Sequence, residues 1–346
     1  MLIGPDIGPI WRAPMWRIVF AAIALIAVSA TSSLGQERIP IKIGWQPVLY
    51  TGLFVAWEKG YFEKNGLNPK FVKFLAGPPI LSSFQTGDVD VAVMGIPPLI
   101  HGVAQGIDLQ TFLVDDEASA GVALVARKGS GIHGPKDLKG KKIAYVFGST
   151  VHPGLLEVLR QNGMSEKDIN LINMQVPAIL PAFERGDVDA VYLWQPWTIK
   201  AQALGGTRVF SDRDVGVYSA GLWAARRDYL EQQRDTVDRF IRSYAEGIAY
   251  ALTHPEETIK IGARLTGTPP ELMGVHFGEL DFLTIERQLS GSPISLGRSN
   301  ALADSPMVKV LDRYISFFFE KKVISSRPDA MKMVNPGAVE RYLGKR

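Results

Sequence analysis

Short apolar runs and stretches with helical spacing alternate along the chain from Lys42 onward. The apolar runs predict strands at 42–46, 69–74, 89–93 and 109–114, and the apolar spacing between them predicts helices at 53–64, 77–86 and 97–105. A strand followed by a helix, repeated several times, indicates a mostly parallel sheet with helices on both faces.

The same order of elements starts again after Glu117. We expect strands at 121–126, 142–147, 169–174, 190–193 and 221–226, and helices at 152–161, 178–185, 235–253, 255–265 and 306–321. The last helices should pack back on the first lobe, so the chain would cross between lobes near 114–118 and 218–223. We therefore predict lobe 1 from residues 36–115 plus 222–346 and lobe 2 from residues 116–221.

An internal repeat supports two similar lobes. Gly87-Asp88-Val89-Asp90 is echoed about a hundred residues later by Gly186-Asp187-Val188-Asp189, and each copy follows a predicted helix and leads into a predicted strand. One copy alone is also typical of an ordinary turn between a helix and a strand. Its recurrence in the same setting favours an α/β protein with two lobes around a cleft.

The N-terminus resembles a secretory signal. Arg12 and Arg17 precede an apolar run at 18–28 and small residues at 29–33, so residues 1–35 are predicted to be a signal peptide, with cleavage after Ala30 or Gly35. The apolar run is short for a membrane span, although an uncleaved anchor is an alternative. The formal net charge is +3 with no basic stripe, which makes nucleic acid an unsuitable partner. A periplasmic location follows.

Signatures of catalysis are absent from the sequence. The chain has no cysteine, its five histidines are far apart, and it lacks the Gly-x-Ser-x-Gly, His-Glu-x-x-His and Walker motifs. The segment 129–134 fits a dinucleotide pattern, but the polar residues after it favour a surface turn. We therefore expect no cofactor, no metal site and no enzyme activity.

A candidate anion site lies where a predicted strand ends and a helix begins. Ser149, Thr150 and His152 follow Gly148 at the start of the helix, where hydroxyls, free N–H groups and the helix dipole suit a sulfonate, phosphate or carboxylate. The alternative is that Ser149 or Thr150 only caps its own helix. Gly95 begins a comparable helix in the first lobe.

Aromatic and amide side chains also follow predicted strands. Trp194 and Gln195 come directly after the strand at 190–193, and Gln46 ends the first strand. Tryptophan is usually a core residue, but a loop after a strand end is a common place for ligand contacts. We expect Gln46, Trp194 and Gln195 to line the cleft.

Several of these segments together resemble the taurine, aliphatic sulfonate and nitrate family of ABC-importer substrate-binding proteins, most closely its taurine-binding branch. The stretches that carry the resemblance, which runs from about 41 to 265, are 87–90, 137–144, 148–152, 176–179, 185–189 and 194–196. The resemblance implies the type II periplasmic-binding fold, with two hinge strands and a ligand cleft. It also implies a diffusing monomer that delivers its ligand to a membrane permease and ATPase.

Carried over by position, the resemblance assigns the ligand contacts. Gln46 and Gly95 would line the first lobe, and Ser149, Thr150 and His152 would meet the acid group of the ligand. Trp194 and Gln195 would form the wall of the second lobe. The ligand would be a small organic anion such as taurine or an alkanesulfonate.

Two departures from the family pattern concern the ligand. Taurine-type sequences have an acidic residue just before a strand tryptophan, and here that position is Gly221. Conversely, Asp115, Asp116 and Glu117 place three acids at the first hinge, where Asp116 could replace the missing partner for a cation. Alternatively, the three acids form a solvated hinge turn.

Other readings stay open at this point. The same fold also occurs in proteins that bind pyrimidine precursors of thiamine, including an enzyme that relies on a cysteine-rich stretch that this chain lacks. An enzyme without a cofactor would need a general base such as His152 or Asp116. A ligand-sensing module that reports to a membrane receptor would have the same sequence features.

Overall fold

Two β-sheets organise the structure, which is a computed structural model that describes Met1, Gly4 and residues 37–344. The predicted signal peptide, with its cleavage after Ala30 or Gly35, lies outside the described residues. Residues 39–346 form one compact unit. Among the described residues, no helix is long and apolar enough to cross a membrane.

The larger sheet has six strands in the order β11-β4-β10-β3-β1-β2. Its strands are β1 (Ile39–Trp45), β2 (Leu67–Lys73), β3 (Val91–Gly95), β4 (Leu109–Glu117), β10 (Ala220–Arg226) and β11 (Asp281–Phe282). β1 is parallel to β2 and β3, whereas β10 is antiparallel to both β3 and β4. β10 therefore returns the chain to the sheet that the first strands built.

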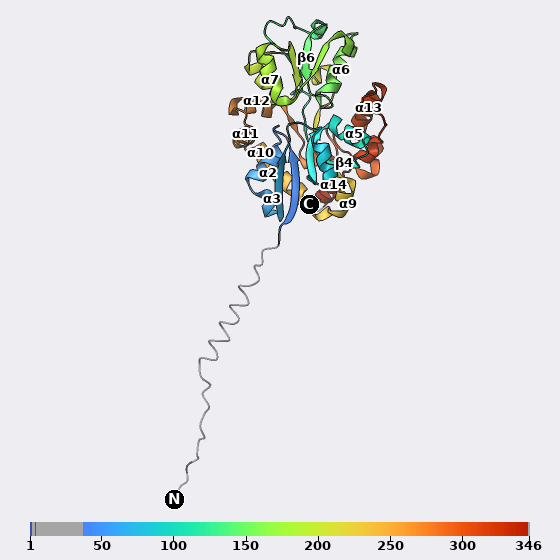
Figure 1. Cartoon of the computed structure of the whole chain (residues 1–346). Helices are drawn as coiled ribbons and strands as arrows, with labels where there is room; N and C mark the ends of the chain where they lie inside the picture. The colour runs from blue at the N-terminus through green and yellow to red at the C-terminus, as the bar shows by residue number, and fades with distance from the viewer. Residues whose placement is uncertain (2–3, 5–36, 345–346) are drawn as a thin grey trace. The chain divides into compact units, whose positions relative to one another are not determined.

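The smaller sheet has five strands in the order β7-β6-β8-β5-β9. Its strands are β5 (Ala123–Ala126), β6 (Lys142–Tyr145), β7 (Asn170–Asn173), β8 (Ala190–Leu193) and β9 (Thr207–Ser211). β6 is parallel to β7 and β8, and β5 is antiparallel to β8 and β9. In Figure 1 this sheet, with α6 and α7, lies above the larger sheet.

Helices cover both sheets and generate two hydrophobic cores, one around each sheet. The helices are α2 (Thr51–Glu58), α3 (Tyr61–Lys64), α4 (Ile80–Thr86), α5 (Ile96–Ala104), α6 (Val151–Gln161), α7 (Val176–Arg185), α8 (Trp197–Ala203), α9 (Arg227–Gln232), α10 (Arg234–Thr253), α11 (Pro255–Thr266), α12 (Pro270–Glu279), α13 (Pro306–Glu320) and α14 (Gly337–Gly344). As predicted, the late helices pack on the larger sheet: α10 contacts α2, α13 contacts α5 and α14 contacts β4. In the lower part of Figure 1, the C-terminal helices (orange to red) therefore lie beside the N-terminal elements (blue).

The two copies of the sequence repeat have the same structural role. The last aspartate of each copy, Asp90 or Asp189, accepts a hydrogen bond on its carboxylate from a backbone N–H of the neighbouring strand: Lys42 within β1 (2.7 Å) or Lys142 at the start of β6 (2.9 Å). The helix before each copy ends at the glycine of the repeat, with φ of 74° and 84°. Each copy therefore ties the start of β3 or β8 to the parallel strand beside it, which is β1 or β6.

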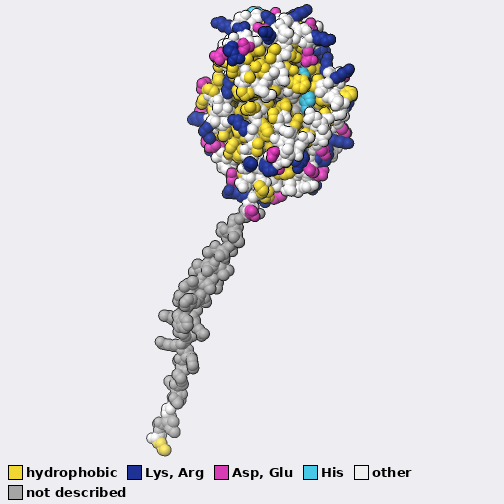
Figure 2. All heavy atoms as spheres, viewed as in Figure 1, with side chains coloured by type: hydrophobic (Ala, Val, Ile, Leu, Met, Phe, Trp, Pro, Cys, Tyr) yellow, Lys and Arg dark blue, Asp and Glu magenta, His cyan; other side chains and the backbone are white. Residues whose placement is uncertain are grey.

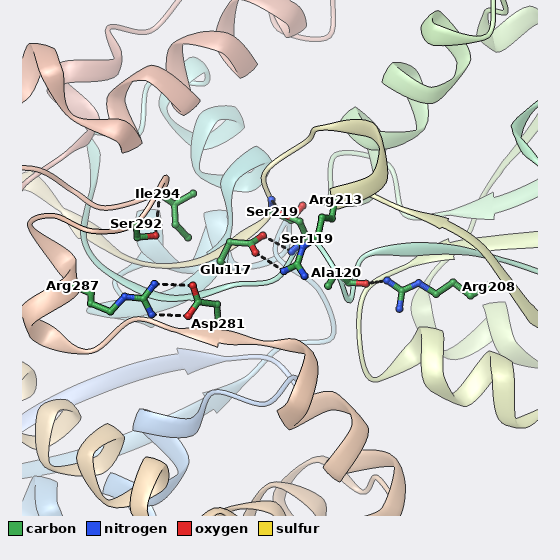
Figure 3. Close-up of polar contacts among 10 residues, drawn as sticks. All are labelled: Glu117, Ser119, Ala120, Arg208, Arg213, Ser219, Asp281, Arg287, Ser292 and Ile294. Atoms are coloured by element: carbon green, nitrogen blue, oxygen red, sulfur yellow. Dashed lines mark hydrogen bonds and ion pairs between the residues drawn. The ribbon is translucent and has the colours of Figure 1, made fainter.

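Two crossing segments, 118–122 and 212–219, connect the sheets, and they are bonded to each other (Figure 3). Glu117 accepts the Ser119 N–H at 2.8 Å and pairs with Arg213 at 2.9 Å. The Ser219 N–H donates to Ser119 Oγ at 2.9 Å. The two segments overlap the predicted crossings near 114–118 and 218–223 only at residues 118 and 218–219, and the bounds of the two lobes stay a prediction.

The three acids at the first crossing do not form the solvated turn that the sequence left open. Asp115, Asp116 and Glu117 are the last residues of β4, and their exposed fractions are 0%, 2% and 7%. The strand continues because β10 pairs with β4 up to Glu117. Because all three acids are buried, the position of each one decides which groups its carboxylate can contact.

Candidate ligand-binding site

A cavity of about 60 Å³ lies where the carboxyl ends of the parallel strands of both sheets meet. It is lined by Gln46, Val48, Tyr50, Gly77, Gly95, Pro98, Asp116, Ala118, Gly121, Val122, Ser149, Thr150, Trp194, Gln195, Ala220, Gly221, His276 and Leu280. Strand ends of an α/β sheet are the usual place for ligands, because loops with free polar groups begin there. The small volume suits a solute of few atoms.

Seven of the eight residues predicted from the sequence line this one cavity. They are Gln46, Gly95, Asp116, Ser149, Thr150, Trp194 and Gln195. They come from five different strand ends of the two sheets, so the fold brings them together from positions up to 149 residues apart in the sequence. Their contact with a ligand stays a prediction.

Two helix N-termini lie next to each other at the cavity. Gly95 is the N-cap residue of α5 and Thr150 is the N-cap residue of α6. They are so close that a Cβ atom added to Gly95 would lie 2.1 Å from Thr150 Oγ1. The positive ends of two helix dipoles therefore meet at this point, which favours an anion.

The hydroxyls at the start of α6 differ in their availability. Ser149 Oγ donates to the Val146 carbonyl at 2.7 Å, so its hydrogen is already used within its own turn. Thr150 makes no capping hydrogen bond with its side chain. Of the two predicted hydroxyls, the one on Thr150 is therefore the donor that can reach into the cavity.

The N-termini of α5 and α6 offer fewer free backbone N–H groups than two helices without proline would. Pro97 and Pro98 occupy the first turn of α5, and Pro153 occupies the first turn of α6. Proline has no N–H, so these helix ends contribute their dipoles more than a full set of hydrogen bonds. No lysine or arginine lines the cavity. An anion would be held by neutral groups.

Asp116 places an acid on the wall of the cavity. Its Oδ1 accepts the Gly221 N–H at 2.9 Å, and no cation among the described residues pairs with it. Burial, followed by repulsion from Asp115, raises its pKa well above the ordinary range. Asp116 is thus a carboxyl group that lacks a counter-ion within the described chain.

The neighbours of Asp116 serve the structure. Asp115 accepts hydrogen bonds from Trp223 Nε1 and from the Tyr244 hydroxyl, both at 3.1 Å, and burial raises its pKa to about 7. Glu117 belongs to the bonded crossing segments shown in Figure 3. Of the three consecutive acids, only Asp116 lines the cavity.

Gln195 has an orientation that its neighbours determine. Its amide Nε2 donates to Glu279 of α12, and Glu279 also pairs with Arg208 of β9 at 2.9 Å. Because a carboxylate only accepts, the nitrogen of the amide must face Glu279. Gln195 Oε1 is then the free end of the amide, and it is buried without a hydrogen-bond partner.

The remaining predicted residues on the cavity form its walls. Trp194, directly after β8, is 9% exposed and lies against the core of the smaller sheet. Gln46, directly after β1, donates from Nε2 to the Val93 carbonyl at 3.1 Å. Its partner lies on β3, so the Gln46 side chain lies across the larger sheet toward the N-terminus of α5.

His152 is the one predicted residue that the structure does not bring to the cavity. It lies in the first turn of α6, is 2% exposed and approaches Glu166 with Nε2 at 3.5 Å. Its ring packs between Tyr145 and Phe147. Burial lowers its pKa, so the ring is a neutral packing residue in this arrangement.

Sequence reasoning missed several residues of the cavity, including Tyr50, His276 and Leu280. His276 lies on α12, is 1% exposed and has a buried Nδ1 without a partner. Burial lowers its pKa to about 3, which keeps the ring neutral. No local signal could identify it, because α12 reaches the cavity only through the tertiary fold. Among the described residues, no cluster of side chains is arranged to hold a metal ion.

Charged side chains of both signs are mixed on the face of the molecule that Figure 2 shows. Figure 2 shows lysine and arginine (blue) interspersed with aspartate and glutamate (magenta) over the visible face.

Comparisons with known proteins identify the family and the fold. The model of the NMT1/THI5-like family matches residues 49–258. The taurine-binding periplasmic protein of Escherichia coli K12 is 28% identical over 260 residues, which are 72% of this chain and 78% of that protein.

Solved structures of periplasmic binding proteins have the same arrangement of elements. The alkanesulfonate-binding protein SsuA from Xanthomonas axonopodis pv. citri bound to MOPS has a TM-score of 0.72 and 21% identity, covering 86% of this chain and 99% of that chain. The aliphatic sulphonate binding protein SsuA from Escherichia coli has a TM-score of 0.71 and 22% identity, covering 87% and 99%. The chain therefore has the predicted periplasmic-binding-protein fold and belongs to the NMT1/THI5-like family.

Proposed function

We propose that this protein is the solute-binding component of an ABC importer and captures a small organic sulfonate. The observation that carries the proposal is the cavity at which the N-termini of α5 and α6 meet, at Gly95 and Thr150. Helix N-termini bind sulfonate-like anions through their dipoles and N–H groups, without the need for a cationic side chain. Relatives named for taurine and alkanesulfonate binding support this ligand class.

Capture requires the ligand to be enclosed between the two sheets, and the structure has contacts that support this. Arg208 of β9 pairs with Glu279 of α12 at 2.9 Å, so an ion pair connects the smaller sheet to a helix whose Met273 belongs to the core around the larger sheet. Gln195, on the cavity wall, is bonded to the same Glu279. Affinity would then depend on the hinge motion that brings both walls onto the ligand.

The proposal includes export, delivery and the absence of catalysis. Residues 1–35 would direct the protein to the periplasm, where a monomer would carry its ligand to a permease and ATPase in the inner membrane. No reaction is assigned, because His152 is packed away from the cavity and Asp116 lacks a partner that would activate it as a base.

A binding screen by calorimetry and thermal shift tests the function. The purified protein would be mixed with taurine, 1-propanesulfonate, nitrate, acetate and an aminopyrimidine, because a ligand that binds only the folded state raises the melting temperature. We expect a sulfonate to bind with a Kd in the micromolar range or below. Binding of the aminopyrimidine alone would refute the sulfonate assignment, and turnover of any ligand would refute a purely binding role.

A further inference from the structure

We propose that a second cavity of this protein binds a small aromatic carboxylate. The cavity, which we call the hinge cavity, has a volume of about 260 Å³ and is lined by residues of α6, α13 and the crossing segment 212–219. The two helices lie one above the other at the right of Figure 1. No residue of the hinge cavity lines the cavity of the candidate site, so the inference goes beyond the proposed function.

The hinge cavity lies where the two hydrophobic cores approach each other. Val217 of the crossing segment packs against both cores, and Val310 and Tyr314 of α13 belong to the core around the larger sheet. The third wall, α6, belongs to the other core, because its Val151 and Leu155 are buried around the smaller sheet. A molecule in the hinge cavity would therefore contact both halves of the protein at once.

The volume and the walls of the hinge cavity suit an aromatic ring. An apolar cavity of about 150 Å³ can hold a benzene molecule, so about 260 Å³ leaves space for a second fused ring. Tyr314 and Phe317 lie on the same face of α13, and Tyr218 lines the cavity from the crossing segment. The Tyr314 hydroxyl already donates to the Tyr218 carbonyl at 2.6 Å, so Tyr314 offers mainly its ring to a ligand. Aromatic side chains bind a further ring by offset stacking or edge-to-face packing.

One positive charge at the hinge cavity has no ion-pair partner in the described part of the chain. Arg160 donates from Nε and Nη2 to the two oxygens of Glu157 at 2.8 Å and 2.7 Å, so these two charges cancel. Arg313 is exposed and makes no hydrogen bond or ion pair with a described residue. The hydrogen bond from Arg160 is the largest cause that lowers the pKa of Glu157, and the charge of Arg313 adds to it. The excess charge at the cavity is therefore that of Arg313.

A guanidinium group selects a carboxylate by its geometry. Its planar fork donates two parallel hydrogen bonds to the two oxygens of a carboxylate. Both oxygens of Glu157 already accept hydrogen bonds from Arg160 or Gln161, so Glu157 offers little to a cationic ligand. Aromatic walls together with one unpaired guanidinium group therefore fit a ring that carries a single carboxylate.

Three ligands of nearly the same shape and different charge test the inference. They are 2-naphthoate, an anion, 2-naphthamide, which is neutral, and 2-naphthamidine, a cation. Isothermal titration calorimetry on the purified protein should give a Kd below about 1 mM for 2-naphthoate, at least about tenfold tighter than for 2-naphthamide, because hydrogen bonds between charged groups are the stronger ones. The amidine should bind more weakly than both, since its charge repels that of Arg313.

Two substitutions locate the binding. Arg313→Gln should raise the Kd of 2-naphthoate at least about tenfold and leave that of 2-naphthamide unchanged, whereas Phe317→Ala should weaken both through the lost ring contact. Arg242→Gln is the matched control, because it makes the same change at an exposed arginine of α10 outside the cavity, and it should alter neither affinity. Replacement of Arg313 removes no hydrogen bond of the described fold, so the variant should fold.

Several results would overturn the inference. One is equal binding of the three ligands, and another is no binding of 2-naphthoate up to about 1 mM. A 2-naphthoate affinity that Arg313→Gln leaves unchanged would also overturn it, because the ligand would then lie elsewhere. A protein that binds no sulfonate refutes the proposed function and leaves this inference standing, since the two cavities share no lining residue.

Discussion

Replacement of Gly95 by alanine should weaken ligand binding without a large effect on the two cores. The new Cβ would lie 2.1 Å from Thr150 Oγ1 and 3.4 Å from Thr150 Cβ. Non-bonded carbon atoms pack at about 3.5–4.0 Å, so the N-termini of α5 and α6 must separate by roughly 1 Å, or Thr150 must leave its rotamer. Either change removes a cavity donor from its position.

The size of the effect follows from these two contributions. A strained rotamer costs about 1 kcal/mol, and loss of one hydrogen bond from Thr150 to a charged ligand costs about 1.5–2 kcal/mol. The sum of about 2.5–3 kcal/mol corresponds to a Kd that is roughly 70- to 150-fold higher. Calorimetry with taurine would measure it. Gly134→Ala is the control, because its φ is −161° and an added Cβ would meet nothing within 4 Å.

A double-mutant cycle identifies the cause. In a Thr150→Ala background the hydroxyl is gone, so Gly95→Ala should add less than about threefold to the Kd. A wild-type affinity in Gly95→Ala would refute the close approach of the two helices. Additive effects of the two substitutions would refute the proposed collision with the hydroxyl.

Four further substitutions test three other parts of the structure. Because the pKa of His276 in the folded protein lies at about 3, below its unfolded value, the folded state loses stability as the pH falls from about 6.5 toward 3; His276→Gln should flatten this decline in melting temperature. Glu279→Ala should raise the Kd roughly 5- to 30-fold through a faster off-rate, because the buried amide of Gln195 loses its acceptor, and unchanged release in stopped flow would contradict this role. Asp90→Ala and Asp189→Ala should each cost about 1–2 kcal/mol in urea denaturation, and a large difference between them would contradict equivalent roles in the repeat.

Much of the fold could be predicted from the sequence because apolar runs and turns mark its elements locally. The strand predicted at 190–193 has the same bounds in the structure, and the predicted helix at 152–161 is α6 (Val151–Gln161). The helix predicted at 53–64 is instead α2 and α3, since Gly60, with φ of 67°, interrupts it. The elements α8, β9, α12 and α14 were not predicted, because their apolar patterns are short.

The site was predictable where strand ends could be identified. Gln46, Gly95 and Gln195 each follow or end a strand, and strand ends of both sheets meet at the cavity. The direction of a side chain in the first turn of a helix is harder to derive from sequence. The prediction was therefore right that Thr150 lines the cavity and wrong for His152. His276 reaches the cavity through tertiary packing, which no local pattern encodes.

The bonds between the two crossing segments limit the ways in which the sheets can move. A protein with two independent connections could bend, twist and shear at its waist. Here Glu117, Ser119, Arg213 and Ser219 join both connections into one bonded unit, so neither can rotate without the other. We therefore expect the main remaining motion to be a bend about a single axis. Few conformational degrees of freedom are then lost on binding, so a small ligand with few contacts can still hold the protein shut.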